Sequence, residues 1–238
     1  MLNYSLEVLQ NGDTETLEEI AQVLADVFAG VKVGERFIQE PMITAAGITN
    51  KGFYDFTRDY LMNVAYQGLT VYARDNDTGR VIGSIASDAF NPNEEVPVFE
   101  GEQSGWNLMY PFLEELDEGL IKKFEQVAER KMTTNDLVHI FLIGVKAEHS
   151  KGIIAKEMID LTYQLGKEKG YVGMFAEATN PKSQKVLKVY NGCSVPIGVD
   201  GELVLKEYNE APFNTIEKDV ATACEINYRA IDNKYKLD

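Results

Sequence analysis

Cysteine and histidine are scarce in this sequence. Among its 238 residues there are two cysteines, Cys193 and Cys224, and two histidines. The cysteines lie far apart in the sequence and lack the close spacing of metal ligands. A disulfide framework is therefore excluded, and we expect no metal site and two reduced thiols in a cytoplasmic protein.

The sequence also lacks long apolar runs and an excess of basic residues. No segment approaches the roughly 20 apolar residues of a membrane-spanning helix. The N-terminal segment MLNYSLEVLQNGD has neither the basic nor the apolar region of a signal peptide. Lysine and arginine number 23 against 38 aspartates and glutamates, which gives a formal net charge of −15. Because nucleic acid is bound by clustered basic residues, we expect neither a membrane nor a nucleic acid as partner.

The acidic balance leaves two interpretations open. An acidic surface attracts cationic substrates, but it also keeps a protein soluble, and solubility is the more general role. Hydrophobic residues make up 45% of the chain and charged residues 26%, as in ordinary soluble globular proteins. The length allows one large domain or two small ones. Since no segment has the composition of a linker, we expect a single domain over residues 1–238.

The first half of the chain is predicted to contain both helices and strands. Apolar residues recur at helical spacing in some segments and follow a β-rich pattern in others. Turn residues from Asp75 to Gly79 separate two β-rich segments and predict a hairpin. A polar stretch with Pro92, Pro97 and Gly101 then leaves the sheet, so we expect a helical insertion at about 90–135. The expected elements are a strand at Tyr4–Val8, a helix capped by Thr14 or Thr16 and reaching Phe28, a helix at Lys51–Ala65, strands at Leu69–Arg74 and Arg80–Ser87, and a helix at Asn107–Lys131.

The second half predicts a strand, helix, strand unit. Val138–Val145 is an almost continuous apolar run, typical of a strand that is buried on both faces. A helix at Lys151–Lys169 ends at Gly170, a common residue just after helices, and Tyr171–Glu177 forms the next strand. Such a unit indicates parallel strands joined by a crossover helix. The remaining expected elements are a short helix beginning at Pro181, and closing strands at Val195–Tyr208, which turns at Asp200 and Gly201, and at Asp219–Ala230.

The junction between Val145 and the following helix has the features of an anion site. Unpaired N–H groups and the helix dipole favour negative charge at a helix N-terminus. Lys151 and Lys156 add positive charge there. This combination suits the pyrophosphate of a nucleotide-like cofactor. The alternative is an ordinary strand-to-helix junction of an α/β protein without a ligand.

The residues of this junction resemble those of the Gcn5-related N-acetyltransferase (GNAT) family, which bind acyl-CoA. In that family a strand ending in Val is followed by about five residues, Arg or Gln, two residues, Gly, one residue, and Gly or Ala. The helix that follows ends in Lys-Gly. In this sequence Val145 matches the strand end, and Lys169 and Gly170 match the helix end.

The loop between those ends can be aligned with the family pattern in two ways. The alignment without gaps places Ser150, Ile153 and Ala155 at the three loop positions of the pattern. A shift by one residue places His149, Gly152 and Ile154 there instead. We prefer the first alignment because it keeps both ends of the pattern.

A second segment, Glu177–Leu187, resembles the next segment of the same family. There a strand ending in Glu-Ala-Thr precedes a helix that begins at Asn-Pro, as Asn180 and Pro181 do here. Most members carry a Tyr general acid at the position of Leu187. Tyr190 lies one turn later and is more typical of a packing residue.

Three features are similar to the arylalkylamine N-acetyltransferase branch of the family. The first is the Glu40-Pro41-Met42 segment in the loop after the first helix. The second is the long insertion from Phe90 to Asn135, and the third is the segment Thr179–Ser183, where that branch often has a Ser and no Tyr acid.

The resemblance implies a fold, a co-substrate and a set of site residues. The fold is an α/β mixed sheet of about seven strands with helices on both faces, and the co-substrate is acetyl-CoA. Glu40 is implied as the general base, Ser183 as a neighbour of the thioester and His139 as a further catalytic candidate. Residues implied in cofactor binding are Ile143, Gly144, Val145, Ser150, Lys151, Gly152, Ile153, Ile154, Ala155, Lys156, Asn180 and Ser183.

The three catalytic candidates also have plainer structural interpretations. Glu40 is alternatively an exposed loop carboxylate. Ser183 is alternatively a first-turn helix residue that bonds backbone groups. His139 is alternatively a core histidine with satisfied hydrogen bonds.

We therefore predict an enzyme that moves acetyl from acetyl-CoA to a primary amine, such as an arylalkylamine, by direct attack. The predicted partner is a small-molecule amine, and the protein is expected to be a monomer or a homodimer. Trp106, Tyr110 and Phe112 are candidates for an aromatic acceptor pocket, although their helical spacing favours core packing. Two alternatives remain: another acceptor, such as a polyamine, amino acid or aminoglycoside, or a non-catalytic CoA-binding module.

Overall fold

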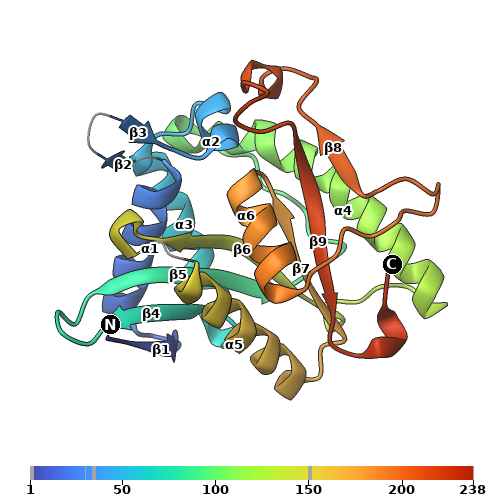
Figure 1. The fold of residues 1–238 in the computed structure, drawn as a ribbon, viewed down its shortest axis with the longest axis horizontal. Helices are drawn as coiled ribbons and strands as arrows, with labels where there is room; N and C mark the ends of the chain where they lie inside the picture. Colours follow the sequence, from blue (N-terminus) through green and yellow to red (C-terminus); the bar gives the residue numbers. More distant parts are fainter. Residues whose placement is uncertain (1–2, 30, 34–35, 150–151, 238) are drawn as a thin grey trace.

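A seven-stranded mixed sheet organises the molecule (Figure 1). The computed structural model describes residues 3–29, 31–33, 36–149 and 152–237. Only the β6–β7 pair is parallel within the sheet of described strands. In sheet order the strands are β1 (Tyr4–Val8), β4 (Val71–Asp75), β5 (Val81–Ala89), β6 (Leu137–Val145), β7 (Gly173–Ala178), β9 (Ala223–Ala230) and β8 (Leu205–Glu207). The predicted fold class is confirmed.

Helices cover both faces of this sheet, and each face has its own hydrophobic core. The helices on one face are α1 (Thr14–Phe28), α3 (Asn50–Val64) and α4 (Trp106–Ala128), with the short α2 (Pro41–Ala45) beside them. The opposite face carries α5 (Ile153–Lys169), followed by α6 (Pro181–Lys185). Short helical turns are η1 (Ala65–Gln67), η2 (Gly101–Gln103), η3 (Ala147–His149), the π-helical η4 (Val186–Tyr190), η5 (Phe213–Thr215) and η6 (Asn233–Tyr235).

The observed helix starts differ by a few residues from the starts that the sequence predicts. Asp13, and not Thr14 or Thr16, caps α1 by accepting a hydrogen bond from the Thr16 N–H at 3.1 Å. Thr49 caps α3 in the same way, through the Gly52 N–H at 3.0 Å. In both helices the apolar stripe is buried, as the sequence spacing predicts.

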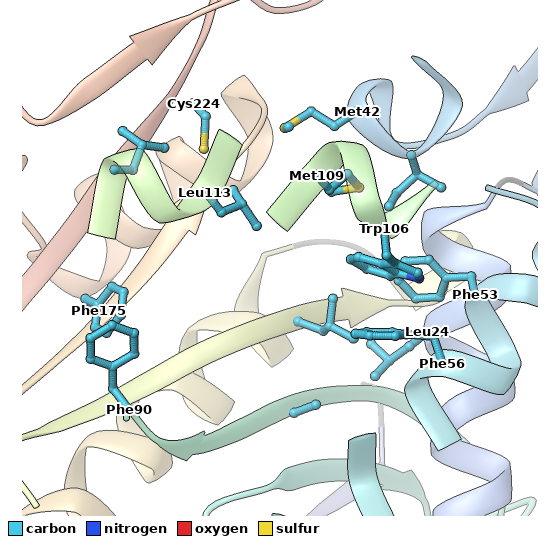
Figure 2. Close-up of a cluster of buried hydrophobic side chains, with 14 of the residues drawn as sticks. Leu24, Met42, Phe53, Phe56, Phe90, Trp106, Met109, Leu113, Phe175 and Cys224 are labelled. Atoms are coloured by element: carbon cyan, nitrogen blue, oxygen red, sulfur yellow. The ribbon is translucent and has the colours of Figure 1, made fainter. Parts of the chain in front are cut away.

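The predicted insertion contains α4, which crosses the face of the sheet that α1 and α3 also cover. The Trp106 ring stacks on Phe56 of α3, with ring centroids 3.8 Å apart (Figure 2). The helix ends at Ala128, before the predicted Lys131, because Glu129 adopts a left-handed conformation with φ of 55°.

Two regions differ from the sequence prediction. Val195–Tyr208 was expected to be a strand pair, yet only Leu205–Glu207 forms a strand, beside isolated bridges such as Ile197 to Leu203. Pro196 has no N–H to donate and Gly198 packs no side chain, so a continuous ladder is not formed there. The last strand, β9, also begins at Ala223 and not at Asp219.

A small hairpin was missed. The strands β2 (Val31–Val33) and β3 (Arg36–Ile38) pair between α1 and α2, where only a loop was expected. Three-residue strands carry too little alternation to stand out in a sequence.

Both cysteines are free thiols, and both are buried. Within the described part of the chain, no helix combines the length and the apolar character that crossing a membrane requires.

Candidate active site

The strands β6 and β7 diverge toward their C-terminal ends. They pair only where Leu137, Val138 and His139 meet Gly173, Met174 and Phe175. Beyond this point β6 continues to Val145, still paired with β5, while β7 continues to Ala178, paired with β9. Among the described strands, none pairs with the edge of β6 that faces β7 from Ile140 to Val145.

Two backbone N–H groups of β6 point into this gap. The Lys146 N–H donates to the Ile82 carbonyl of β5 at 2.9 Å. Successive backbone N–H groups of a strand point to opposite sides. The Gly144 N–H therefore also faces β5, whereas the N–H groups of Ile143 and Val145 face β7. Of these predicted cofactor residues, Ile143 and Val145 have the amides suited to bind an oxygen atom in the gap.

A cleft lies at this gap and is lined by residues from both faces of the sheet. Its lining is mostly apolar, with Glu40 and Glu177 as its carboxylates. The lining residues are Phe28, Glu40, Ile43, Trp106, Met109, Leu113, Ile140, Phe141, Leu142, Ile143, Ala176, Glu177, Thr179, Asn180, Ser183 and Leu187. The cleft thus brings together the predicted residues Glu40, Ile143, Asn180 and Ser183.

Glu40 is buried at the start of α2, where a loop carboxylate had been expected. Its Oε2 atom accepts a hydrogen bond from the Ile43 N–H at 2.9 Å. Its Oε1 atom is buried and has no hydrogen-bond partner among the described residues. Burial raises the pKa of Glu40, and the nearby Thr179 side chain and Ile43 amide only partly offset this effect. The carboxylate is thus more basic than an exposed one.

Ser183 and Asn180 form a capping box at the start of α6. The Asn180 side chain accepts from the N–H groups of Lys182 and Ser183, at 3.0 and 3.1 Å. The Ser183 hydroxyl donates to the Asn180 carbonyl at 2.9 Å. Ser183 lines the cleft, but its hydroxyl has the helix-capping contacts of the plainer interpretation.

His139 lies under the cleft between two carboxylates. Its Nε2 atom is 2.8 Å from Glu177 Oε2 and its Nδ1 atom 3.2 Å from Asp88 Oδ1. Burial alone would lower the pKa of His139, but Glu177 and Asp88 together raise it well above its usual value. A charged imidazolium has no lone pair to accept a proton, so these contacts argue against His139 as a base.

Asp117 of α4 completes this buried network. Its pKa is raised well above the ordinary value by burial and by the neighbouring charge of Glu177. Burial acts to raise the pKa of Glu177 as well, but His139 and a hydrogen bond from Asp117 lower it. The surroundings therefore favour the protonated forms of Asp117 and His139 and the ionised form of Glu177, and these contacts link α4 to β6 and β7.

The start of α5 differs from the preferred alignment of the loop. Gly152 is the N-cap and has a φ of 80°, a conformation that favours glycine. The preferred alignment had placed Ile153 at the family's glycine, but Ile153 is the first helical residue and its side chain is 59% exposed. The conformation fits the shifted alignment, in which Gly152 is that glycine.

The other predicted residues of the junction have separate environments. Ile154 and Ala155 are buried residues in the first turn of α5, and the Lys156 ammonium pairs with Asp160 at 2.6 Å. Ser150 and Lys151 lie outside the described residues. Among the described residues, no group of three or more His, Cys, Asp or Glu side chains is arranged to hold a metal ion.

The usual tyrosine acid has no counterpart on the cleft. Leu187 is buried and lines it, whereas Tyr190, in the π-helical turn η4, is 42% exposed. Sequence reasoning missed Tyr208, whose hydroxyl donates to the Thr179 carbonyl at 2.6 Å and fixes the β7–α6 junction. No sequence motif connects these two residues, because the contact joins segments that are distant in the chain.

Comparisons with known proteins identify the same architecture in several solved structures. No protein-family model matches the chain, and no curated protein matches it. The C-terminal condensation domain of Ebony, in complex with beta-alanyl-dopamine, superposes with a TM-score of 0.68 at 17% identity, covering 97% of this chain and 100% of that one. Arylalkylamine N-acetyltransferase 2 from Aedes aegypti gives a TM-score of 0.70 at 17% identity, with 97% and 100% coverage.

A Drosophila melanogaster polyamine N-acetyltransferase that forms N-acetylagmatine gives a TM-score of 0.60 at 12% identity, with 96% and 100% coverage. These similarities extend over nearly the whole chain. The chain therefore has the fold of the Gcn5-related N-acetyltransferase superfamily, in the form seen in its arylalkylamine N-acetyltransferases.

Proposed function

We propose that this protein transfers an acetyl group from acetyl-CoA to a small primary amine. One observation carries the proposal: the N–H groups of Ile143 and Val145 face the gap between β6 and β7, and the cleft that Ile143 lines in this gap also holds the buried carboxylate of Glu40. Acyl transfer needs hydrogen-bond donors for the carbonyl oxygen and a base for the nucleophile, and this cleft offers both.

The proposed donor site is on the α5 and α6 side of the cleft. The two strand amides would bind the thioester carbonyl oxygen and stabilise the negative charge that develops on it. The N-terminus of α5 at Gly152 suits the pyrophosphate, and Asn180 and Ser183 flank the path of the pantetheine arm.

The proposed acceptor site is on the α4 side, beside Glu40. Glu40 takes a proton from the ammonium group, and the neutral nitrogen attacks the thioester carbon. The carbon–sulfur bond then breaks and its electron pair leaves with the CoA sulfur. The nitrogen loses its second proton as the amide forms, and this proton is transferred to the departing thiolate, directly or through water, to give the CoA thiol. Since Leu187 replaces the usual tyrosine, no side-chain acid is assigned to the thiolate.

The acceptor class follows from the cleft walls. Phe28, Ile43, Trp106, Met109 and Phe141 would enclose an apolar body, which favours an arylalkylamine. The arylalkylamine N-acetyltransferase with the same fold supports this acceptor, and the polyamine enzyme supports a polyamine as the alternative. We also propose that the whole chain is one catalytic domain with a helical insertion at about residues 90–135.

A second candidate function is amide formation from an acyl donor other than CoA. One observation favours it: the Ebony domain with this fold is a condensation domain. Both candidates share the chemistry of Glu40 and the strand amides and differ only in the donor.

Binding and turnover measurements separate these candidates. Acetyl-CoA and CoA should each raise the melting temperature, because a ligand that binds only the folded state stabilises it. With acetyl-CoA and a panel of arylalkylamines and polyamines, mass spectrometry should detect the acetylated amine and free CoA thiol. An absence of both stabilisation and product would overturn the CoA-dependent function and leave the other donor, or a non-catalytic module.

A further inference from the structure

Tyr208 follows β8 and lies beside the junction between β7 and α6. It is only 7% exposed, and its hydroxyl donates to the Thr179 carbonyl at 2.6 Å. The ring packs against Phe112 of α4 and Phe213 of η5, with ring centroids 5.7 and 6.3 Å away. The Tyr208 N–H also donates to the Thr222 carbonyl at 3.0 Å. The hydroxyl is therefore held in place by segments that lie outside the junction.

Three consecutive backbone carbonyls form this junction. Residues of α6 bond the first and the third: Gln184 Nε2 donates to the Ala178 carbonyl at 3.2 Å, and the Ser183 hydroxyl donates to the Asn180 carbonyl at 2.9 Å. The middle carbonyl, that of Thr179, accepts from Tyr208, which is 29 residues away in the chain. The position of Thr179 thus depends on a contact that neither β7 nor α6 provides.

The junction presents two polar side chains to the cleft, those of Thr179 and Asn180, and Glu40 lines the same cleft. Burial raises the pKa of Glu40, and the Thr179 and Asn180 side chains act against this effect, together with backbone N–H groups of α2. The titratable groups that face Glu40 from other elements are Tyr208 and Cys224 of β9. Burial raises the pKa of both, so both are neutral. The charge state of Glu40 therefore depends on the polar groups beside it.

We propose that Tyr208 is a positioning residue for acyl transfer, whose hydroxyl fixes the Thr179 backbone so that the Thr179 side chain stays beside the Glu40 carboxylate. The inference rests on the proposed function, in which Glu40 takes the proton of the amine. Tyr208 is not among the described residues that line the cleft, so it acts through Thr179. Without its hydroxyl, Thr179 is free to move, and the carboxylate loses a group that stabilises its charged form.

A titration that does not depend on turnover tests this role. The proteins are labelled with ¹³C at the glutamate side-chain carboxyl groups, and the Glu40 signal is identified by its absence from Glu40→Gln. In Tyr208→Phe the Glu40 signal should titrate at a higher pH than in the wild type, because the phenyl ring keeps the packing but donates no hydrogen bond. The same titration midpoint in both proteins would overturn the proposal.

The Thr179→Val variant tests whether the effect passes through Thr179. It removes the side-chain hydroxyl at nearly constant size and should also move the Glu40 titration to higher pH. The double variant, Tyr208→Phe with Thr179→Val, should move it no further than Thr179→Val alone, since both changes remove one interaction. Additive shifts would contradict a path through Thr179. If Tyr208→Phe does not fold, Thr179→Val decides the outcome, and an unchanged Glu40 titration in it overturns the proposal.

Tyr228→Phe is the matched control. It removes another buried tyrosine hydroxyl, which donates to the Tyr235 carbonyl at 2.7 Å, and neither residue is among those that line the cleft. Its melting temperature should fall as in Tyr208→Phe, while the Glu40 titration stays at the wild-type value. An equal shift in Tyr228→Phe would show a general loss of structure and overturn the positioning role.

Activity gives a second readout if the wild type acetylates an amine. At pH 6, kcat/KM of Tyr208→Phe should be roughly two- to tenfold below that of the wild type, and the difference should shrink at pH 9, where Glu40 is ionised in both. A shifted Glu40 titration without any acetylated product supports the positioning role and contradicts the proposed function. Product formation with an unshifted titration supports the proposed function and overturns the positioning role.

Discussion

At the residue scale, the same type of side chain has opposite roles in different environments. Glu40 is buried without a cationic partner, so burial raises its pKa and makes it a stronger base. Glu177 is also buried but lies beside the charged His139, so its pKa is lowered and it stays ionised. The two carboxylates line one cleft, and only Glu40 has an oxygen without a partner among the described residues.

The Glu40→Gln variant tests the assignment of the base. Glutamine keeps the size of the side chain but cannot take a proton, so turnover of an amine should fall by roughly 10²–10⁴ while CoA affinity is unchanged. The loss should shrink at high pH, where the amine arrives neutral. The rate of the wild-type enzyme should rise with pH through the raised pKa of Glu40.

The control is Glu168→Gln, which changes an exposed carboxylate of α5. Its turnover should equal that of the wild type in steady-state assays. If Glu40→Gln turns over normally at pH 7, the base is another group. The resemblance to the arylalkylamine branch would then lose its main support.

His139 predicts a pH dependence of stability. Its pKa is raised in the folded state, so its contribution is complete below the unfolded pKa of about 6.5. The contribution is then lost as the pH rises through the folded value. Denaturant unfolding of the wild type and of His139→Gln at pH 5 to 9 should give a difference that is largest at the acidic end, about 3–5 kcal/mol.

The matched control is His149→Gln, at the other histidine of the chain. A difference between wild type and His139→Gln that stays constant over this range would show that His139 is neutral in the folded protein. It would then be available again as a base.

At the element scale, the long periodic segments were predictable and the short ones were not. Val138–Val145 was recognised because a strand buried on both faces is apolar throughout, and it matches β6 within one residue. The three-residue strands β2, β3 and β8 offer no such pattern. The resemblance likewise predicted Glu40 and Asn180 as site residues. Their burial and contacts could not be predicted, because these depend on segments distant in the chain.

The start of α5 yields a prediction about the cofactor loop. Gly152→Ala places a Cβ at φ of 80°, which should cost about 1–2 kcal/mol and weaken CoA binding. Ile153→Gly should preserve CoA affinity, because the exposed side chain is simply removed, at a cost of up to ~1 kcal/mol in helix stability. Isothermal titration with CoA and denaturant unfolding measure both effects.

Gly12→Ala is the control for backbone strain, since Gly12 also has a positive φ, 88°, but precedes α1. The Gly12→Ala variant should be less stable than the wild type but bind CoA with the same affinity. If Gly152→Ala binds CoA as the wild type does, the loop does not approach the donor.

At the scale of the whole molecule, the net charge of −15 is consistent with a cationic acceptor or with solubility alone. The screening length falls from about 30 Å at 10 mM salt to about 8 Å at 150 mM. At saturating acetyl-CoA, kcat/KM for a diamine should therefore fall several-fold over this range, and less for a monoamine. Equal values at both salt concentrations would assign the acidic surface to solubility.

In the proposed reaction, the donor thioester lies between β6 and β7 and reacts there. A crystal structure with bound acetyl-CoA tests it most directly. We expect the thioester carbonyl oxygen at about 3 Å from the N–H groups of Ile143 and Val145, with the pyrophosphate at Gly152 and the Glu40 carboxylate across the cleft. Acetyl-CoA bound elsewhere, or a thioester oxygen without contact to these amides, would contradict it.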